Sequence, residues 1–238
     1  MISNIISMVK EYGWQFFDGI KVTVSLAVLG TIFGLIISLM FSILRTIKIN
    51  QNDKNYIKVL KYIGHIFVKI YVTLFRGTPM IVQAVIFYYV FYTAGIEWGA
   101  FSAGLFTISL NTAAYLTEVL RSGIDSVDKG QYEAARSIGL SSVKTFIFII
   151  FPQAIKNSFS SIGNELIVNI KDSSVLSVIS VIDIFTVADS AAGKYFLYVE
   201  AMLIAATIYL VLTFATSLVL RFIEKRIGVP SKGIVSSN

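Results

Sequence analysis

The sequence contains no cysteine, and this absence excludes several kinds of chemistry at once. No disulfide, thiol nucleophile or cysteine-ligated metal site can form within it. His65 is the only histidine, so an imidazole metal site is not expected, and we interpret this residue as an interfacial side chain. The sequence also lacks a G-x-x-x-x-G-K-[ST] motif, through which a P-loop would bind ATP. We therefore predict that the chain is not an enzyme and binds no cofactor itself.

Charged residues are scarce, at 14% of 238 residues, whereas 55% of the residues are hydrophobic. Soluble domains are typically about 25% charged. A helix needs roughly 20 apolar residues to cross the hydrocarbon core of a membrane. The whole chain, 1–238, is therefore predicted to be one all-α membrane domain with five transmembrane helices. These lie near 20–44, 62–92, 101–120, 160–182 and 196–220.

The net charge of +6 predicts an orientation in the membrane rather than a nucleic-acid partner. The cations collect after the first span, in the central loop and after the last span. They are Arg45, Lys48, Lys54, Lys58 and Lys61; Arg121, Lys129, Arg136 and Lys144; and Arg221, Lys225, Arg226 and Lys232. In segments 92–100 and 183–195, by contrast, Lys194 is the only Lys or Arg. Because cytoplasmic loops carry the excess of Lys and Arg, we predict the N-terminus outside and the C-terminus in the cytoplasm.

A polar segment, 126–155, lies between two apolar spans and has the sequence features of two short helices. Asp128 can cap the first helix, and Gln131 three residues later completes a pair like a capping box. Gly139 stands where a left-handed residue would end that helix. Ser141 can cap the second helix, and Pro152 should stop or bend it.

This segment resembles the EAA loop of bacterial ABC importer permeases. The family pattern is E-A-A, three residues, G, nine residues, I-x-L-P, and Phe151 here replaces the Leu. The resemblance implies the five-span type I importer fold and a coupling helix that docks on a cytoplasmic ATPase. The residues expected to take part in this coupling are Gln131, Glu133, Ala134, Ala135, Arg136 and Gly139.

Further matches resemble the polar amino acid subfamily of these permeases, which carries histidine, glutamine, arginine or cystine. They are R-G-T-P at 76–79 with Gln83, A-Y-x-x-E-x-x-R-x-G-I at 114–124, S-V-x-x-G-Q at 126–131, K-D-S-S at 171–174, I-Y-L at 208–210 and E-K-R at 224–226. The matches follow the subfamily order from about residue 74 to 226. We expect Glu118 and Arg121, spaced i and i+3, to form an ion pair.

Polar groups within the predicted spans are candidates for substrate contact, because they are costly in a membrane. Glu165, Asn169 and Asp172 share one helix face by their i, i+4, i+7 spacing. Asn164 and Asn111 are further candidates, and Gln83 follows the R-G-T-P motif.

The pair Asn164-Glu165 resembles an N-E pair in relatives that carry basic amino acids, where the Glu meets the side-chain cation. Basic amino acids are therefore the first substrate hypothesis, with glutamine or cystine as alternatives. Glu165 could instead pair with an internal cation such as Lys171.

The resemblance also implies partners. These are a dimer of ATPase subunits that binds ATP and Mg²⁺, a second permease subunit (identical or related) and an extracellular or periplasmic amino acid-binding protein. The binding protein would meet the outer segments around 92–100 and 183–197. The expected location is the bacterial cell membrane, in contact with lipid. An ion-coupled secondary transporter is the alternative class; it would show inverted repeats, and none is visible in the sequence.

The predicted orientation can be tested directly by cysteine labelling, since the native chain has no cysteine. An impermeant thiol reagent added outside the cell should label Glu97→Cys and leave Gly130→Cys unlabelled. Labelling of both after the membrane is opened serves as the control. Labelling of position 130 alone from outside would reverse the orientation.

Overall fold

The computed structural model describes residues 1–47, 49 and 53–228, and this part of the chain is helical with no strand. Lys48 and Lys232, which were used to predict the orientation, lie outside the described residues. The α-helices are α1 (Ile2–Thr46), α2 (Asn55–Gly77), α3 (Met80–Thr93), α4 (Ala100–Asp125), α5 (Lys129–Ser137), α6 (Ser142–Thr145), α7 (Phe151–Asp172), α8 (Ile184–Tyr195) and α9 (Tyr198–Ile227). A π-helical turn, Phe146–Ile150, precedes α7, and a 3₁₀ helix, Ser173–Ile179, follows it.

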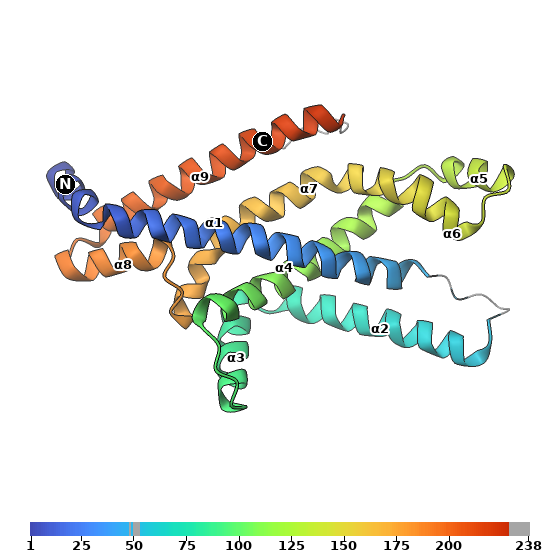
Figure 1. The fold of residues 1–238 in the computed structure, drawn as a ribbon, viewed down its shortest axis with the longest axis horizontal. Coiled ribbons are helices and arrows are strands. Elements are labelled where there is room, and N and C mark those ends of the chain that lie inside the picture. The colour runs from blue at the N-terminus through green and yellow to red at the C-terminus, as the bar shows by residue number, and fades with distance from the viewer. Residues whose placement is uncertain (48, 50–52, 229–238) are drawn as a thin grey trace.

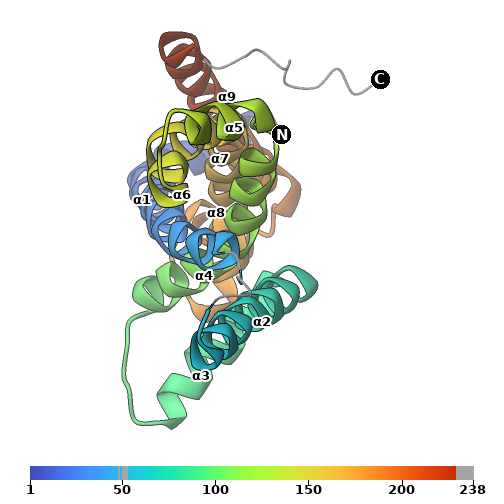
Figure 2. The same ribbon diagram turned by 90° about the vertical axis from the view of Figure 1, so that its right-hand side faces the viewer.

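The helices form an elongated bundle in which α1 runs along the long axis (Figure 1). The short helices α5 and α6 lie at one end, and the N-terminus and α8 lie at the other. Viewed from the end, α2 and α3 lie to one side of α1, α4 and α7 (Figure 2). The cytoplasmic loop predicted at 126–155 is thus at the opposite end of the molecule from the N-terminus.

The contact between α1 and α4 is close because α1 presents glycine to it. A Cβ atom added to Gly34 would lie 2.8 Å from Cγ2 of Thr112, and one added to Gly30 would overlap the side chain of Ile108. Small residues allow helix backbones to approach in this way within membranes. The same region is joined by hydrogen bonds: Thr112 Oγ1 donates to Asn169 Oδ1 (3.0 Å), and Asn169 Nδ2 donates to Thr31 Oγ1 (2.9 Å). One buried amide therefore fastens α1, α4 and α7 together.

The stretch 62–92, predicted as a single span, lies in two helices, and the chain bends by 110° between them. The break falls at Thr78 and Pro79, between the end of α2 and the start of α3. Thr78 is extended, with ψ of 144°, as the residue before a proline prefers. The sequence signalled a helix interruption here, but its angle depends on how α3 packs against α4 and the 3₁₀ helix.

A second bend, of 55°, separates α7 and its 3₁₀ extension from α8. Asp183 caps α8 and is fully buried. Its carboxylate accepts hydrogen bonds from Thr186 N (3.0 Å), from Ser173 Oγ (3.4 Å) and from Tyr209 Oη of α9 (2.8 Å). The segment 183–197, predicted as an outer loop, is therefore mostly the helix α8, whose apolar face is buried.

By length and composition, α1 and α9 are each able to cross a membrane, and up to four spans result if each bent pair counts as one. The predicted third span corresponds to α4, whose middle contains Asn111, Thr112 and Thr117 and is less apolar for that reason. Those residues are partly or fully buried within the bundle. The count of five spans stays a prediction.

Candidate functional site

A cavity of about 290 Å³ lies where the break between α2 and α3 meets α4 and α7. Its lining is mixed in chemistry, with carboxylates, amides, a hydroxyl and a phenol beside apolar groups. The lining residues are Thr78, Pro79, Met80, Asn111, Tyr115, Glu165, Val168, Asn169 and Asp172. Four of the six residues predicted to contact substrate are therefore brought together here: Asn111, Glu165, Asn169 and Asp172.

Gln83, the fifth predicted residue, is buried behind this cavity and stabilises the helix break. Its Nε2 atom donates to Phe75 O (2.9 Å), Thr78 O (3.0 Å) and Thr78 Oγ1 (2.8 Å). The last carbonyl groups of a helix have no partner within it, and leaving them unpaired in a membrane is costly. Gln83 supplies the donor for them, so its side chain holds the cavity wall.

Asn111 comes from α4 and joins the same network. Its Nδ2 atom donates to Gln83 Oε1 (3.0 Å) and, at 3.4 Å, to Phe75 O. Within the described residues its Oδ1 atom accepts no hydrogen bond, although the residue lines the cavity. Asn111 thus has a fixed orientation and a free acceptor.

Glu165 and Asp172 are the two acidic residues of the cavity lining, and both are half-buried. Among the residues that the structure describes, neither carboxylate has an ion pair or a hydrogen bond. In particular, Glu165 does not pair with Lys171, which is exposed. The cavity lining contains these two carboxylates and no Lys or Arg side chain, which favours a cationic ligand.

Asn169 and Asn164 differ in position although both were predicted to contact substrate. Asn169 lines the cavity, but its amide oxygen and nitrogen already bond to Thr112 and Thr31. Asn164 is exposed and lies outside the cavity lining.

Several residues of this site were not among the sequence candidates. Thr78, Pro79 and Met80 line it because the helix breaks there, and Tyr115 lines it from α4. The guanidinium of Arg76 lies 5.3 Å from the centre of the Tyr115 ring, a cation–π contact. The R-G-T-P and A-Y motifs contain Thr78, Pro79 and Tyr115, and Met80 directly follows the first motif, so the signal was present in the sequence.

No group of three or more His, Cys, Asp or Glu side chains able to hold a metal ion occurs in residues 1–47, 49 and 53–228.

The second predicted site, the polar loop, has the capping geometry expected from the sequence. Asp128 caps α5, although its carboxylate accepts from Gly130 N (2.6 Å) rather than from Gln131. Gly139 ends α5 in the left-handed region, at φ 85°. Leu140 N donates to Ala135 O (3.1 Å), the 6→1 hydrogen bond of a Schellman turn.

The second short helix also begins as predicted, with the Ser141 hydroxyl accepting from Lys144 N (3.3 Å). At Pro152 the helical run does not end. A π-helical turn comes directly before α7, and Pro152 occupies the first turn of that helix. A π-helical turn changes the local ladder of hydrogen bonds, which accommodates a residue that lacks an N–H group.

The surface of α5 is open to solvent on most sides. Gln131, Glu133, Ala134, Arg136 and Gly139 are exposed, whereas Ala135 is 5% exposed and packs inward. Ile138, at the end of the helix, is 80% exposed. This is the pattern of a helix whose outer side is free for a partner.

An ion-pair cluster connects the base of this loop to α1. The predicted pair is confirmed: Arg121 Nε donates to Glu118 Oε2 at 2.7 Å. Arg121 also reaches Asp125 Oδ2 (2.7 Å), and Arg45 of α1 donates to Glu118 Oε1. Sequence reasoning missed Arg45, because it is 73 residues away from Glu118 along the chain. The cluster joins the last turn of α4, next to the loop, to the end of α1.

These features agree with the comparisons with known proteins. Residues 62–229 match the family of binding-protein-dependent transport system inner membrane components. Because this match covers more than half of the chain, the protein belongs to that family.

Curated relatives extend the likeness over almost the whole chain. A putative glutamine transport system permease from Rickettsia conorii is 37% identical over 225 residues, which are 93% of this chain and 98% of the relative. The arginine transport system permease ArtQ of Bacillus subtilis is 32% identical, over 88% of this chain and 91% of its own length. The L-cystine permease TcyB of the same organism is 33% identical, over 92% and 90%.

The fold is likewise similar to solved structures. A crystal structure of an amino acid ABC transporter with histidines matches with a TM-score of 0.81 and 35% identity, covering 93% of this chain and 98% of that one. An inward-facing methionine ABC transporter matches in fold, with a TM-score of 0.71 at 16% identity over 91% and 98%. The predicted all-α permease fold of the type I importers is supported by these matches.

The left-handed turn at Gly139 generates a testable prediction. No neighbour lies within 4 Å of a Cβ atom added there, so a substitution acts through backbone strain alone. A β-branched side chain resists φ 85° by about 1–2 kcal/mol. In a complex reconstituted from this chain and its expected ATPase partner, Gly139→Val should therefore lower substrate-stimulated ATPase activity. Insertion of the chain into the membrane should persist.

Gly139→Asn is the matched control, since Asn tolerates the left-handed region, and it should retain most of the activity. Equal, normal activity in both variants would show that this turn does not matter for coupling.

Proposed function

We propose that the chain is the membrane-spanning permease subunit of an ABC importer that carries a polar amino acid, most suitably a basic one, into the cytoplasm. The observation that carries this proposal is the cavity at the helix break, where Glu165 and Asp172 form no ion pair within the described residues. Family membership and amino acid-transporting relatives support the same reading.

The chemistry of the cavity fits an amino acid with a cationic side chain. Such a substrate carries one carboxylate and two cationic groups. Glu165 and Asp172 can each accept a charge-assisted hydrogen bond from a cation, and Asn111 has a free amide oxygen that accepts from N–H. The guanidinium of Arg76 lies 5.3 Å from the centre of the ring of Tyr115, which lines the cavity, and it would attract the substrate carboxylate.

Glutamine and cystine are the alternative substrates, and relatives named for both exist. The glutamine side chain is neutral, so it would offer the Glu165 carboxylate no cationic side chain to pair with. Such a carboxylate is costly, which favours the basic substrate.

The energy for transport would come from a separate ATPase dimer, which holds ATP and Mg²⁺. Its docking site is α5, with Gln131, Glu133, Ala134, Arg136 and Gly139 on the exposed side. Closure of the ATPases would move α5, and the ion pairs of Glu118 would pass this movement to α4 and α1. Transport then follows from the different affinities of the two conformations for substrate.

Three further partners complete the proposal: a second permease subunit, identical or related, membrane lipid, and a binding protein outside the cell. The binding protein would dock at the end of the bundle that carries α8 and on residues 94–99, which follow α3 where it projects to the side of the bundle (Figure 1). The location is the bacterial cell membrane. Co-purification of an ATPase subunit with the chain distinguishes this function from an ion-coupled secondary transporter, which would purify without one.

The substrate role of Glu165 is testable with Glu165→Gln, which keeps the shape and removes the charge. A hydrogen bond to a charged group contributes roughly 1.5–3 kcal/mol, so the apparent affinity for arginine, lysine and histidine should fall about ten- to a hundredfold. Basal ATPase activity and assembly should remain. Uptake by the purified complex in vesicles gives the measurement.

Asn164→Ala is the control, because this neighbouring residue is exposed and lies outside the cavity. Uptake of arginine, lysine and histidine by this variant should be unchanged. An unaltered affinity in Glu165→Gln would refute the role. Failure of assembly, with every substrate affected alike, would point to an internal pairing of Glu165 instead.

A further inference from the structure

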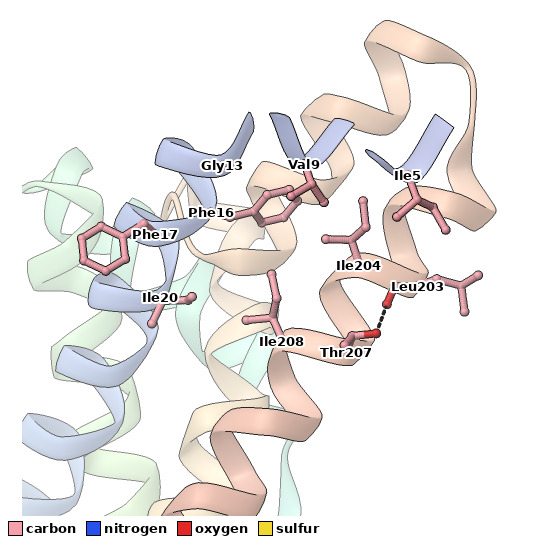
Figure 3. A pocket seen from close by; sticks show the side chains of 10 residues that line it. All are labelled: Ile5, Val9, Gly13, Phe16, Phe17, Ile20, Leu203, Ile204, Thr207 and Ile208. Carbon is pink, nitrogen blue, oxygen red and sulfur yellow. Dashed lines mark hydrogen bonds between the residues drawn. The ribbon is translucent and has the colours of Figure 1, made fainter. Parts of the chain in front are cut away.

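A second, larger hollow lies at the end of the bundle opposite the coupling loop, between the first half of α1 and the start of α9 (Figure 3). We call it the α1–α9 groove; it has a volume of about 470 Å³. Its lining residues are Ile5, Val9, Gly13, Phe16, Phe17, Ile20, Leu203, Ile204, Thr207 and Ile208. Thr207 is the polar member, and its hydroxyl donates to Leu203 O (2.7 Å). The groove therefore suits a hydrocarbon ligand that makes no hydrogen bonds.

The length of α1 brings this groove to the membrane boundary. With 45 residues the helix is about 68 Å long, whereas the hydrocarbon core is about 30 Å thick. Part of α1 must therefore extend through the headgroup region. Trp14, on the groove-bearing half, is 80% exposed, as aromatic side chains at a membrane interface often are.

Two lysines of α1 lie on the Phe17 side of the groove. Lys21 Nζ lies 4.4 Å from the centre of the Phe17 ring, but Asp18 neutralises this lysine at 2.9 Å. Lys10 lies seven residues before Phe17, two turns away on the same side of α1. Lys10 is exposed and forms no ion pair within the described part of the chain. One exposed lysine that forms no ion pair among the described residues thus lies beside the apolar groove.

We propose that the α1–α9 groove binds one anionic phospholipid, with an acyl chain along Gly13, Ile20 and Ile208 and the headgroup phosphate at Lys10. An apolar groove in a membrane gains little free energy from hydrocarbon alone, since the bulk lipid is equally apolar. Selection for this ligand comes from the charge of Lys10, as basic side chains near a membrane surface attract anionic headgroups. The site is separate from the polar cavity and does not rest on the proposed substrate.

Gly13 allows the groove to be filled without disturbing the fold. No atom lies within 4 Å of a Cβ atom added at Gly13, so Gly13→Leu projects into open space. Gly193 of α8 is equally open and lies outside the groove, which makes Gly193→Leu a matched control. The probe is phosphatidylglycerol that stays bound to the protein when it is purified, with its co-purifying subunits, from a membrane containing phosphatidylglycerol and phosphatidylethanolamine. Native mass spectrometry counts the retained lipid.

The wild-type protein and Gly193→Leu should each retain one phosphatidylglycerol per chain, and Gly13→Leu should retain about tenfold less. Lys10→Gln should reduce the preference for phosphatidylglycerol over phosphatidylethanolamine about fivefold, the effect of about 1 kcal/mol per cation. Retention that Gly13→Leu leaves unchanged, or a wild-type protein that retains both lipids equally, would overturn the proposal. So would a disulfide between Val9→Cys of one chain and a second copy of the chain, since another protein would then fill the groove.

Discussion

The hydrogen bonds of the Gln83 amide are the interaction on which the rest of the site depends. A helix that breaks at Thr78 and Pro79 leaves its last carbonyl groups without partners within the helix, and unpaired carbonyl groups are costly in a membrane. Gln83 Nε2 donates to two of these carbonyls, and Gln83 Oε1 holds Asn111 of α4. The break, the 110° bend and the cavity beside it are therefore one feature, stabilised by one side chain.

Polar residues of the bundle divide into those that hold helices together and those that remain available. Asn169 has both amide atoms engaged, with Thr112 and Thr31, and so belongs to the first kind. Glu165 and Asp172 belong to the second kind, since both line the same cavity and form no ion pair or hydrogen bond in the part of the chain that the structure describes. A pathway for a charged solute needs both kinds of residue. The residues that hold the helices together keep the cavity walls rigid, so that the free carboxylates do not pair with residues around the cavity.

The sequence predicted local features well and distant contacts poorly. Asp128, Gly139 and Ser141 occupy the capping positions expected of them, because caps depend on residues a few positions apart. Four of the six residues predicted to contact substrate line the cavity, and helical spacing placed three of them on one face. The sequence did not predict four features. These are the hydrogen bonds of the Asn169 amide, the hydrogen bonds of Gln83 at the helix break, the ion pair of Arg45 with Glu118, and the helix α8. Each depends on which distant helices pack together, and spacing along one helix carries no signal for that.

The central claim, that the polar cavity is the path of the substrate, can be tested by protection of an engineered thiol. Met80 lines the cavity, and the native chain has no cysteine. In the reconstituted complex, arginine should slow the modification of Met80→Cys by a small thiol reagent, while Asn164→Cys, outside the cavity, should react at an unchanged rate. If a transported amino acid changes the rate at position 164 but not at position 80, the substrate does not pass through this cavity.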